Sequence, residues 1–151
     1  MYILGNNAAG LLNKLESFYR NIENFKPGVY FIQESKCKRK NKVKHDEYIM
    51  FELIRKHNAG GGLLTAVHKN LSPVSVSEDT DDEVLVVQGN VGNYKVRFIN
   101  GYGPQEGPLD TNISFFNRLD YEVRNSKLTG TLICMELDAN SKLGSKLEYQ
   151  S

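Results

Sequence analysis

Residues 11–35 read LLNKLESFYRNIENFKPGVYFIQES, and this stretch decides the fold. Its apolar residues recur at intervals of three and four, the period of a helix with one buried face: Leu11, Leu15, Phe18, Ile22 and Phe25. Lys26-Pro27-Gly28 ends the helix, because proline cannot continue it. The β-branched and aromatic run at 29–32 is typical of a buried strand. We therefore expect an amphipathic helix over 12–25, followed by a strand that closes at Gln33 and Glu34.

The rest of the chain alternates short apolar runs with turn-forming residues. Further strands are predicted at 2–6, 48–53, 63–67, 84–88, 94–100 and 131–137, and a second helix from 110 or 111 to 125. The glycines and asparagines at 89–93 suit a hairpin turn, and the glycine run at 60–62 suits a tight turn or close strand packing. Two helices among about seven strands predict an α+β domain whose helices cover the outside of its sheets.

The composition is that of a single globular domain. The chain has 151 residues, of which 40% are hydrophobic and 25% charged, enough to bury a core. Its apolar stretches are far shorter than the roughly 20 residues of a membrane span, so no membrane association is expected. Cys37 lies in a lysine-rich segment and Cys134 in an apolar run, which favours reduced thiols and an intracellular location.

The net charge of +1 conceals two charged segments of opposite sign. Residues 36–44 carry six lysines and arginines, whereas residues 78–83 are mostly acidic. Beside an active site, the basic segment would attract phosphate groups. A solvated flexible loop explains the same residues equally well, so the segment alone does not decide between these interpretations.

Several predicted strands end in polar residues that their apolar neighbours do not explain. Ligand sites collect at such strand ends in mixed sheets, although each residue alone is more often a turn former. The residues concerned are Asn7, Glu34, Asn100, Tyr102, Asp138 and Asn140. Their joint occurrence indicates a functional site.

Four motifs at these strand ends resemble the ordered motifs of the endonuclease/exonuclease/phosphatase superfamily. The motifs are Asn7 in NNAAG, Glu34 in IQESK, Asn100 and Tyr102 in RFINGYGP, and Asp138 and Asn140 in LDAN. The asparagine-tyrosine-proline strand end is most similar to the endonuclease of non-LTR retrotransposons. The resemblance implies a DNase I-like α/β sandwich over residues 1–144, followed by a tail at 145–151.

The resemblance also implies a metal-dependent phosphodiester hydrolase. Glu34 would bind Mg²⁺, with Mn²⁺ as the alternative metal. Asn7 would orient Glu34 or a phosphate oxygen, and Tyr102 would contact the phosphate. Asp138 would orient and deprotonate the attacking water, and Asn140 would donate a hydrogen bond to the developing negative charge.

The implied substrate is nucleic acid, with DNA favoured over RNA. Lys36, Lys38, Arg39 and Asn100 are expected to bind it. Two alternatives remain open. Phosphatases of inositol lipids and sphingomyelinases share the same core, so the substrate could be a lipid or a small phosphoester. The chain could also be a binding module that holds nucleic acid or a partner protein without cleaving anything.

The sequence departs from the family pattern after Asn140. Family members continue through further strands to a Ser-Asp-His motif, which is not found here, and none of the histidines present follows a Ser-Asp pair: His45, His57 and His68. We interpret these histidines as surface or loop residues. The chain is therefore expected to carry only the N-terminal part of the family domain. It would be a weak or inactive catalyst alone, prone to self-association through an exposed sheet, and whether it is an enzyme stays open.

Overall fold

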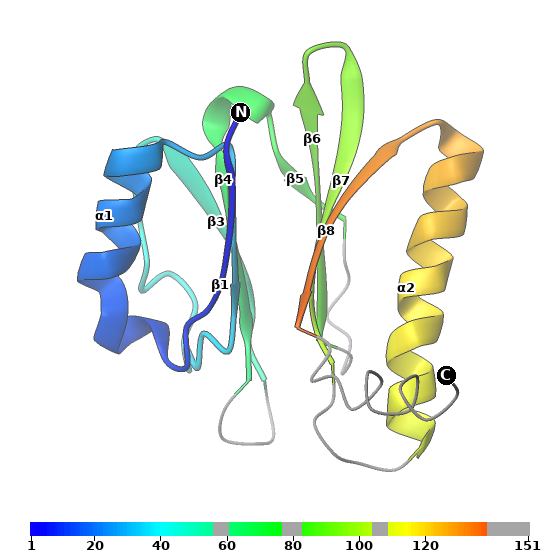
Figure 1. The fold of residues 1–151 in the computed structure, drawn as a ribbon, viewed down its shortest axis with the longest axis horizontal. Coiled ribbons are helices and arrows are strands. Elements are labelled where there is room, and N and C mark those ends of the chain that lie inside the picture. The colour runs from blue at the N-terminus through cyan, green and yellow to red at the C-terminus, as the bar shows by residue number, and fades with distance from the viewer. Residues whose placement is uncertain (56–60, 77–82, 104–108, 139–151) are drawn as a thin grey trace, which may run out of the picture.

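The computed structural model describes residues 1–55, 61–76, 83–103 and 109–138. Over this part of the chain it forms two four-stranded sheets that pack face to face, with one α-helix on the outer side of each (Figure 1). This is the predicted α+β arrangement, in which helices cover the outside of the sheets.

The first sheet is covered by the helix that residues 11–35 predict. Its strand order is β1-β2-β4-β3, with β1 parallel to β2 and the other pairs antiparallel. Phe18 and Ile22 of the helix pack on Tyr30 and Ile32 of β2. The elements are β1 (Ile3–Asn7), a 3-10 turn (Leu11–Lys14), α1 (Leu15–Phe25), β2 (Val29–Gln33), β3 (Tyr48–Leu53) and β4 (Leu63–His68).

The second sheet has the order β5-β6-β7-β8, with β7 parallel to β8. Phe115 and Leu119 of α2 pack on its outer face against Val86 and Ile99. The elements are a 3-10 turn (Lys69–Leu71), β5 (Val74–Ser75), β6 (Val84–Val91), β7 (Tyr94–Tyr102), α2 (Leu109–Thr129) and β8 (Leu132–Asp138). Neither helix in the described part of the chain is long and apolar enough to cross a membrane.

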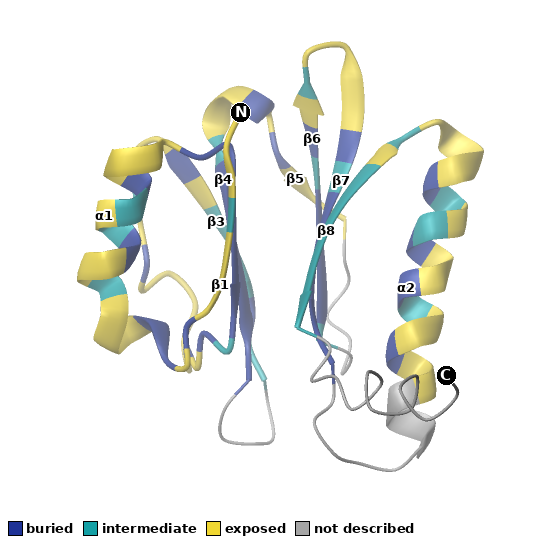
Figure 2. Cartoon of the chain, viewed as in Figure 1, coloured by how far each residue is buried: buried dark blue, intermediate teal, exposed yellow. Residues whose placement is uncertain are grey.

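The central core lies between the two sheets (Figure 2). Successive side chains of a strand point to opposite faces, so Val29 and Phe31 of β2 meet the other sheet while Tyr30 and Ile32 meet α1. Phe98 of β7 faces Phe31 within the same apolar cluster. Because β2 is covered on both sides, all five of its residues are buried.

Most predicted elements are confirmed, and the differences lie at their ends. The hairpin turn was predicted at 89–93, but Gly89, Asn90 and Val91 pair with β7 as part of β6, which leaves Gly92 and Asn93 as the turn. Gly92 has a φ of 58°, which suits such a two-residue turn. The second helix continues to Thr129, beyond the expected end at 125. The two-residue strand β5 was not predicted.

Candidate functional site

The polar strand ends meet because their strands run parallel in pairs. In β1 and β2, Asn7 lies beside Gln33, and in β7 and β8, Tyr102 lies beside Asp138. The carboxyl ends of parallel strands meet at one edge of a sheet, where ligand sites tend to form. Two hydrogen bonds join the edges across the sandwich: Asn7 Nδ2 donates to Asp138 Oδ2 at 2.7 Å, and the Tyr102 hydroxyl donates to Glu34 Oε1.

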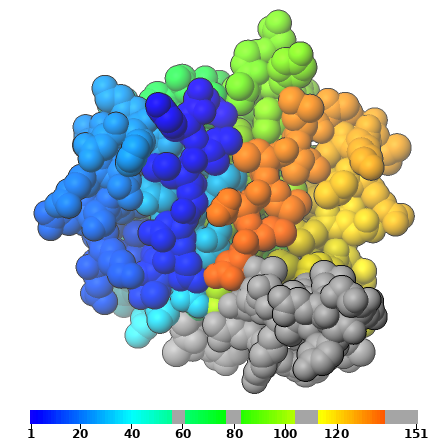
Figure 3. All heavy atoms as spheres, in the orientation of Figure 1, coloured from blue at the N-terminus to red at the C-terminus, as the bar shows by residue number. Residues whose placement is uncertain are grey.

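The two sheets approach each other at their edge strands, β1 and β8. Figure 3 shows β1 in blue beside β8 in orange on one face of the molecule. Gly5 of β1 lies under the half-buried Glu136 side chain of β8, and a β-carbon at this glycine would come within 2.5 Å of Glu136 Oε1. The absence of a side chain at Gly5 therefore lets the two edges come close enough for Asn7 to reach Asp138.

Glu34 is held in an unusual backbone conformation directly after β2. Its φ of 49° lies in the left-handed region, which costs a residue other than glycine roughly 1–2 kcal/mol. The chain on either side is fixed by hydrogen bonds: the carbonyl of Glu34 accepts from Gly10 N, and Ser35 N donates to Gly62 O. This conformation directs the carboxylate toward Tyr102, whose side chain is buried.

Asn7 was expected to orient Glu34 or a phosphate oxygen. Its amide nitrogen instead donates to Asp138, and its Oδ1 accepts from the backbone of Ala9 at 3.1 Å. Both ends of the Asn7 amide are thus engaged, so it fixes the orientation of Asp138. The structure brings Asn7, Glu34, Tyr102 and Asp138 together, although a contact between Tyr102 and a phosphate stays a prediction.

Asn100, predicted to bind substrate, lies in the interior with no exposed surface. Its Oδ1 accepts from Gln33 Nε2 at 2.9 Å, and its Nδ2 lies 3.1 to 3.2 Å from Ile32 O, Leu64 O and Thr65 Oγ1. The side-chain amide thus joins the sheets immediately behind the site. This placement supports a structural role and gives no support to direct substrate binding.

The basic segment is anchored while its cations face outward. Cys37 and Val43 are buried in the core that α1 covers, and Asn41 N donates to Glu52 Oε2 at 3.0 Å. Burial raises the pKa of the Glu52 carboxyl and, together with the charge of Glu52, that of the Cys37 thiol. The cations predicted to bind substrate are all exposed: Lys36, Lys38 and Arg39. The anchors argue against a freely flexible loop.

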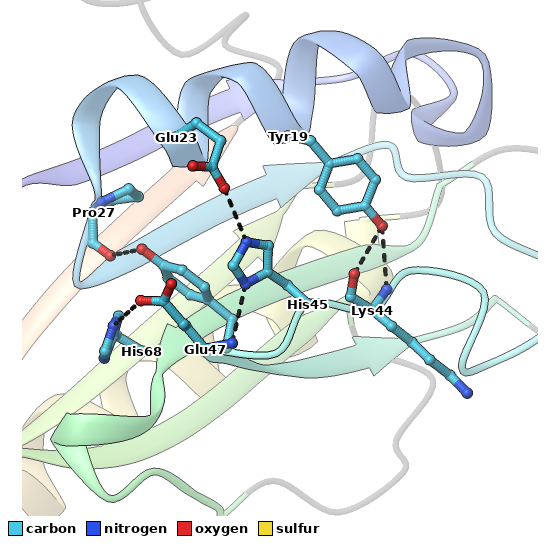
Figure 4. Close-up of polar contacts among 8 residues, drawn as sticks. Tyr19, Glu23, Pro27, Lys44, His45, Glu47 and His68 are labelled. Carbon is cyan, nitrogen blue, oxygen red and sulfur yellow. Dashed lines mark hydrogen bonds and ion pairs between the residues drawn. The ribbon is translucent and has the colours of Figure 1, made fainter.

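The described histidines lie far from Glu34. His68 pairs with Tyr48 at the end of β4 opposite Leu63, the residue that pairs with Gln33. Figure 4 shows His45 contacting Glu23 and His68 contacting Glu47, at 3.4 and 3.3 Å. His45 lies in the segment before β3 and His68 ends β4, and both rings are partly buried with hydrogen bonds to exposed carboxylates. His57 and Asn140 lie outside the described residues.

The donor atoms at the strand ends fit a hard divalent cation. Mg²⁺ is usually held by one or two carboxylates, with water and substrate phosphate completing its coordination. Glu34 supplies such a carboxylate at the edge of the sandwich, and Asp138 is a further carboxylate among the same strand ends. In the described segments, no three side chains of His, Cys, Asp or Glu cluster as a ready-made metal cage. Oxygen donors of this kind suit a hard cation better than a soft one.

No family model and no curated protein matches this sequence. Solved structures do match. The catalytic domain of Xenopus laevis APE2 superposes with a TM-score of 0.80 at 14% identity, covering 93% of this chain and 59% of that domain. The endonuclease domain of TRAS1, a telomere-specific non-LTR retrotransposon, superposes with a TM-score of 0.60 at 17% identity and the same coverage.

A third match is the 3′ phosphatase NExo from Neisseria, in a structure bound to a product DNA hairpin. Its TM-score is 0.62 at 13% identity, covering 91% of this chain and 57% of that one. This chain therefore spans less than two thirds of each of these structures. At such identities the likeness concerns the fold alone. The chain therefore has the DNase I-like fold that these solved structures share.

Proposed function

We propose that this chain is a metal-dependent phosphodiester hydrolase of the endonuclease type, acting on nucleic acid, with DNA favoured over RNA. One observation carries the proposal: Asn7, Glu34, Tyr102 and Asp138 arrive from four strands of two sheets and are joined by hydrogen bonds at one edge. A purely structural polar cluster has no need of two carboxylates at the carboxyl ends of parallel strands. A phosphoester site needs a metal ligand and a proton acceptor there.

Each residue has a role that suits its chemistry. Glu34 would bind Mg²⁺, or Mn²⁺, and the bound ion would supply positive charge to the phosphate. Asp138 accepts the proton of the attacking water, and Asn7 keeps that carboxylate oriented through its bond to Oδ2. Tyr102 holds the Glu34 carboxylate through its hydroxyl. Asn140 would donate a hydrogen bond to the negative charge that develops on phosphorus-bound oxygen.

The basic segment provides the surface for a polyanion. Lys36, Lys38 and Arg39 are exposed and follow Glu34 within five residues. Neutralising several phosphates with such cations releases counterions, so affinity for nucleic acid should fall steeply with salt. A small phosphoester or a lipid headgroup offers fewer charges and should show a shallower dependence.

A second candidate function is binding without cleavage. It is favoured by the exposed cations of the basic segment, which suit a polyanion whether or not it is cleaved: Lys36, Lys38 and Arg39. Within the described residues, β1 and β8 are edge strands of their sheets, and an edge strand is where a chain of this kind would self-associate.

The test is nicking of supercoiled plasmid by the purified chain with Mg²⁺ and with EDTA. Glu34→Gln and Asp138→Asn keep the shape of each side chain and remove its charge. We expect slow Mg²⁺-dependent nicking by the wild type and a loss of about 10²-fold or more in each variant. Glu16→Gln is the matched control, because Glu16 is an exposed carboxylate on α1 whose partner is Arg20.

Binding is measured on the same proteins by fluorescence anisotropy of a labelled duplex over a range of salt. Nicking that survives in Glu34→Gln and Asp138→Asn at the wild-type rate would contradict the site. Salt-dependent binding by all four proteins, with no nicking by any of them, would favour the binding module. Hydrolysis of a small phosphoester without affinity for the duplex would favour a lipid or small-molecule substrate over nucleic acid.

A further inference from the structure

An ion pair ties the two sheets together beside the candidate site. Arg55 follows β3 and Glu83 precedes β6, 28 residues further along the chain. Arg55 Nε lies 3.0 Å from Glu83 Oε1, and Arg55 Nη2 lies 2.8 Å from Glu83 Oε2. The side chains are 31% and 11% exposed. Two parallel bonds between a planar guanidinium and a carboxylate fix their relative orientation as well as their distance.

Glu83 contacts the backbone on both sides of the site. Its Oε1 also accepts a hydrogen bond from Gly62 N at 2.9 Å. Its carbonyl oxygen accepts from Tyr102 N at 3.0 Å. One residue therefore fixes the strand end that carries Tyr102 and a turn of the opposite sheet.

Gly61 and Gly62 connect Glu83 to the backbone beside Glu34 through hydrogen bonds. Gly62 O accepts from Ser35 N at 3.1 Å, and Gly61 O accepts from Lys36 N at 2.9 Å. These are the two residues that follow Glu34, so the bonds set the direction of its backbone. Both glycines have positive φ, and a β-carbon at Gly61 would overlap Glu83 Oε1. The prediction for the glycine run was a tight turn or close strand packing; Gly61 packs closely on the side chains of Glu83 and Arg55, and Gly60 lies outside the described residues.

We propose that the Arg55–Glu83 pair is a positioning device that keeps the Glu34 carboxylate and the Tyr102 hydroxyl in register. The inference rests on the proposed function, since it assigns the pair to the same site. Glu34 and Tyr102 belong to different sheets, and their bond forms only if both strand ends are placed together. A displacement of a catalytic group by about 1 Å can lower the reaction rate roughly 10²-fold. Arg55 also neutralises Glu83, which would otherwise repel phosphate.

Two conservative variants test the device. Arg55→Lys keeps the charge and loses the planar fork, and Glu83→Gln keeps an acceptor for Gly62 and loses the charge. In the Mg²⁺-dependent cleavage of a labelled duplex, we expect kcat to fall about tenfold or more in each, with KM changed by less than about twofold. The matched control is Arg97→Lys, which breaks a more buried pair with Glu122 on the opposite face of β7.

Amide hydrogen exchange gives a readout that does not depend on activity. The amides of Tyr102 and Lys36 should exchange about tenfold faster in Arg55→Lys and Glu83→Gln, with Val67 in the core unchanged. Arg97→Lys should lower global stability without this selective effect. Selective exchange together with the fall in kcat supports the proposal. Unchanged exchange, or faster exchange with a wild-type kcat, would overturn it.

The two proposals can fail separately. If the wild type cleaves nothing, the proposed function fails. The exchange data then decide alone whether the pair holds the two strand ends: selective exchange at Tyr102 and Lys36 supports the restraint, and exchange no faster than in Arg97→Lys overturns it.

Discussion

At the scale of single residues, the site depends on backbone conformations that most side chains avoid. Glu34 and Lys36 both have positive φ, at 49° and 53°, and Gly62 opposite them has a φ of 86°. Strained residues of this kind persist where surrounding bonds over-determine them, and they cluster at functional sites. Here the strained conformation is held by the backbone hydrogen bonds of Ser35 and Lys36 to Gly62 and Gly61. The carboxylate of Glu34 is therefore placed by its neighbours' backbones.

Gly62→Ala should destabilise the fold more than Gly92→Ala. Both glycines have positive φ, so both substitutions carry the left-handed cost. A β-carbon at Gly62 would also lie 2.7 Å from Ser35 Oγ, whereas at Gly92 nothing lies within 4 Å. The overpacking should add about 1–3 kcal/mol to the loss in free energy of unfolding. Urea denaturation measures the difference, and equal losses in the two variants would show that the turn is not tightly packed on the Glu34 segment.

At the scale of elements, the two sheets are joined by a buried polar bridge behind the site. Gln33, Thr65 and Asn100 come from β2, β4 and β7, and none has more than 3% of its surface exposed. Gln33 directly precedes Glu34, and Asn100 lies two residues before Tyr102 on the same face of its strand. The bridge therefore sets the register between the strand ends that carry the site.

Asn100→Ala should lower the free energy of unfolding by at least about 2 kcal/mol. Each buried polar group that is left without a partner costs about 1–3 kcal/mol. The groups left unpaired include Gln33 Nε2 and Ile32 O. Asn21→Ala is a suitable comparison, since Asn21 makes a single part-buried bond to Tyr30 and should cost about 1 kcal/mol. Chemical denaturation with matched m-values gives both numbers. A loss at Asn100 no greater than at Asn21 would mean that the bridge does not hold the sheets together.

Local patterns were sufficient to predict most elements and to single out polar strand ends that meet in the structure. The three-and-four spacing predicted α1, and the β-branched runs predicted the longer strands, because these periods reflect which faces are buried. Polar residues after apolar strands identified Asn7, Glu34, Tyr102 and Asp138. The predicted start of the hairpin turn was wrong, because the pairing of 89–91 with β7 decides where the turn begins and local turn propensity does not.

Long-range pairing could not be predicted in this way. Asn100 meets Gln33 across 67 residues and Arg55 meets Glu83 across 28, and no local period encodes either contact. The polar strand end at Asn100 was interpreted as part of the site, although the residue is buried. Glu83 belongs to the acidic segment at 78–83, in which the sequence pattern indicates no partner for any single carboxylate. Burial and pairing of these residues follow from the packing of the two sheets, which the sequence pattern alone does not specify.

At the scale of the whole molecule, the two-sheet arrangement determines what the chain can do. Each sheet places one pair of parallel strands with its carboxyl ends at the same edge, and the sandwich brings the two edges together at Asn7 and Asp138. The chain covers 59% of the APE2 catalytic domain that it resembles in fold, yet this part contains all four strand ends of the candidate site. We therefore predict that this chain binds a divalent metal by itself.

The most direct test is a Mg²⁺ titration of the ¹⁵N-labelled chain, followed by backbone amide chemical shifts. We predict changes centred on Asn7, residues 34–36, Tyr102 and Asp138, and their loss in Glu34→Gln but not in Glu16→Gln. Changes that persist in Glu34→Gln, or that centre on Glu23 and Glu47 at the opposite end of the first sheet, would contradict a metal site at the strand ends.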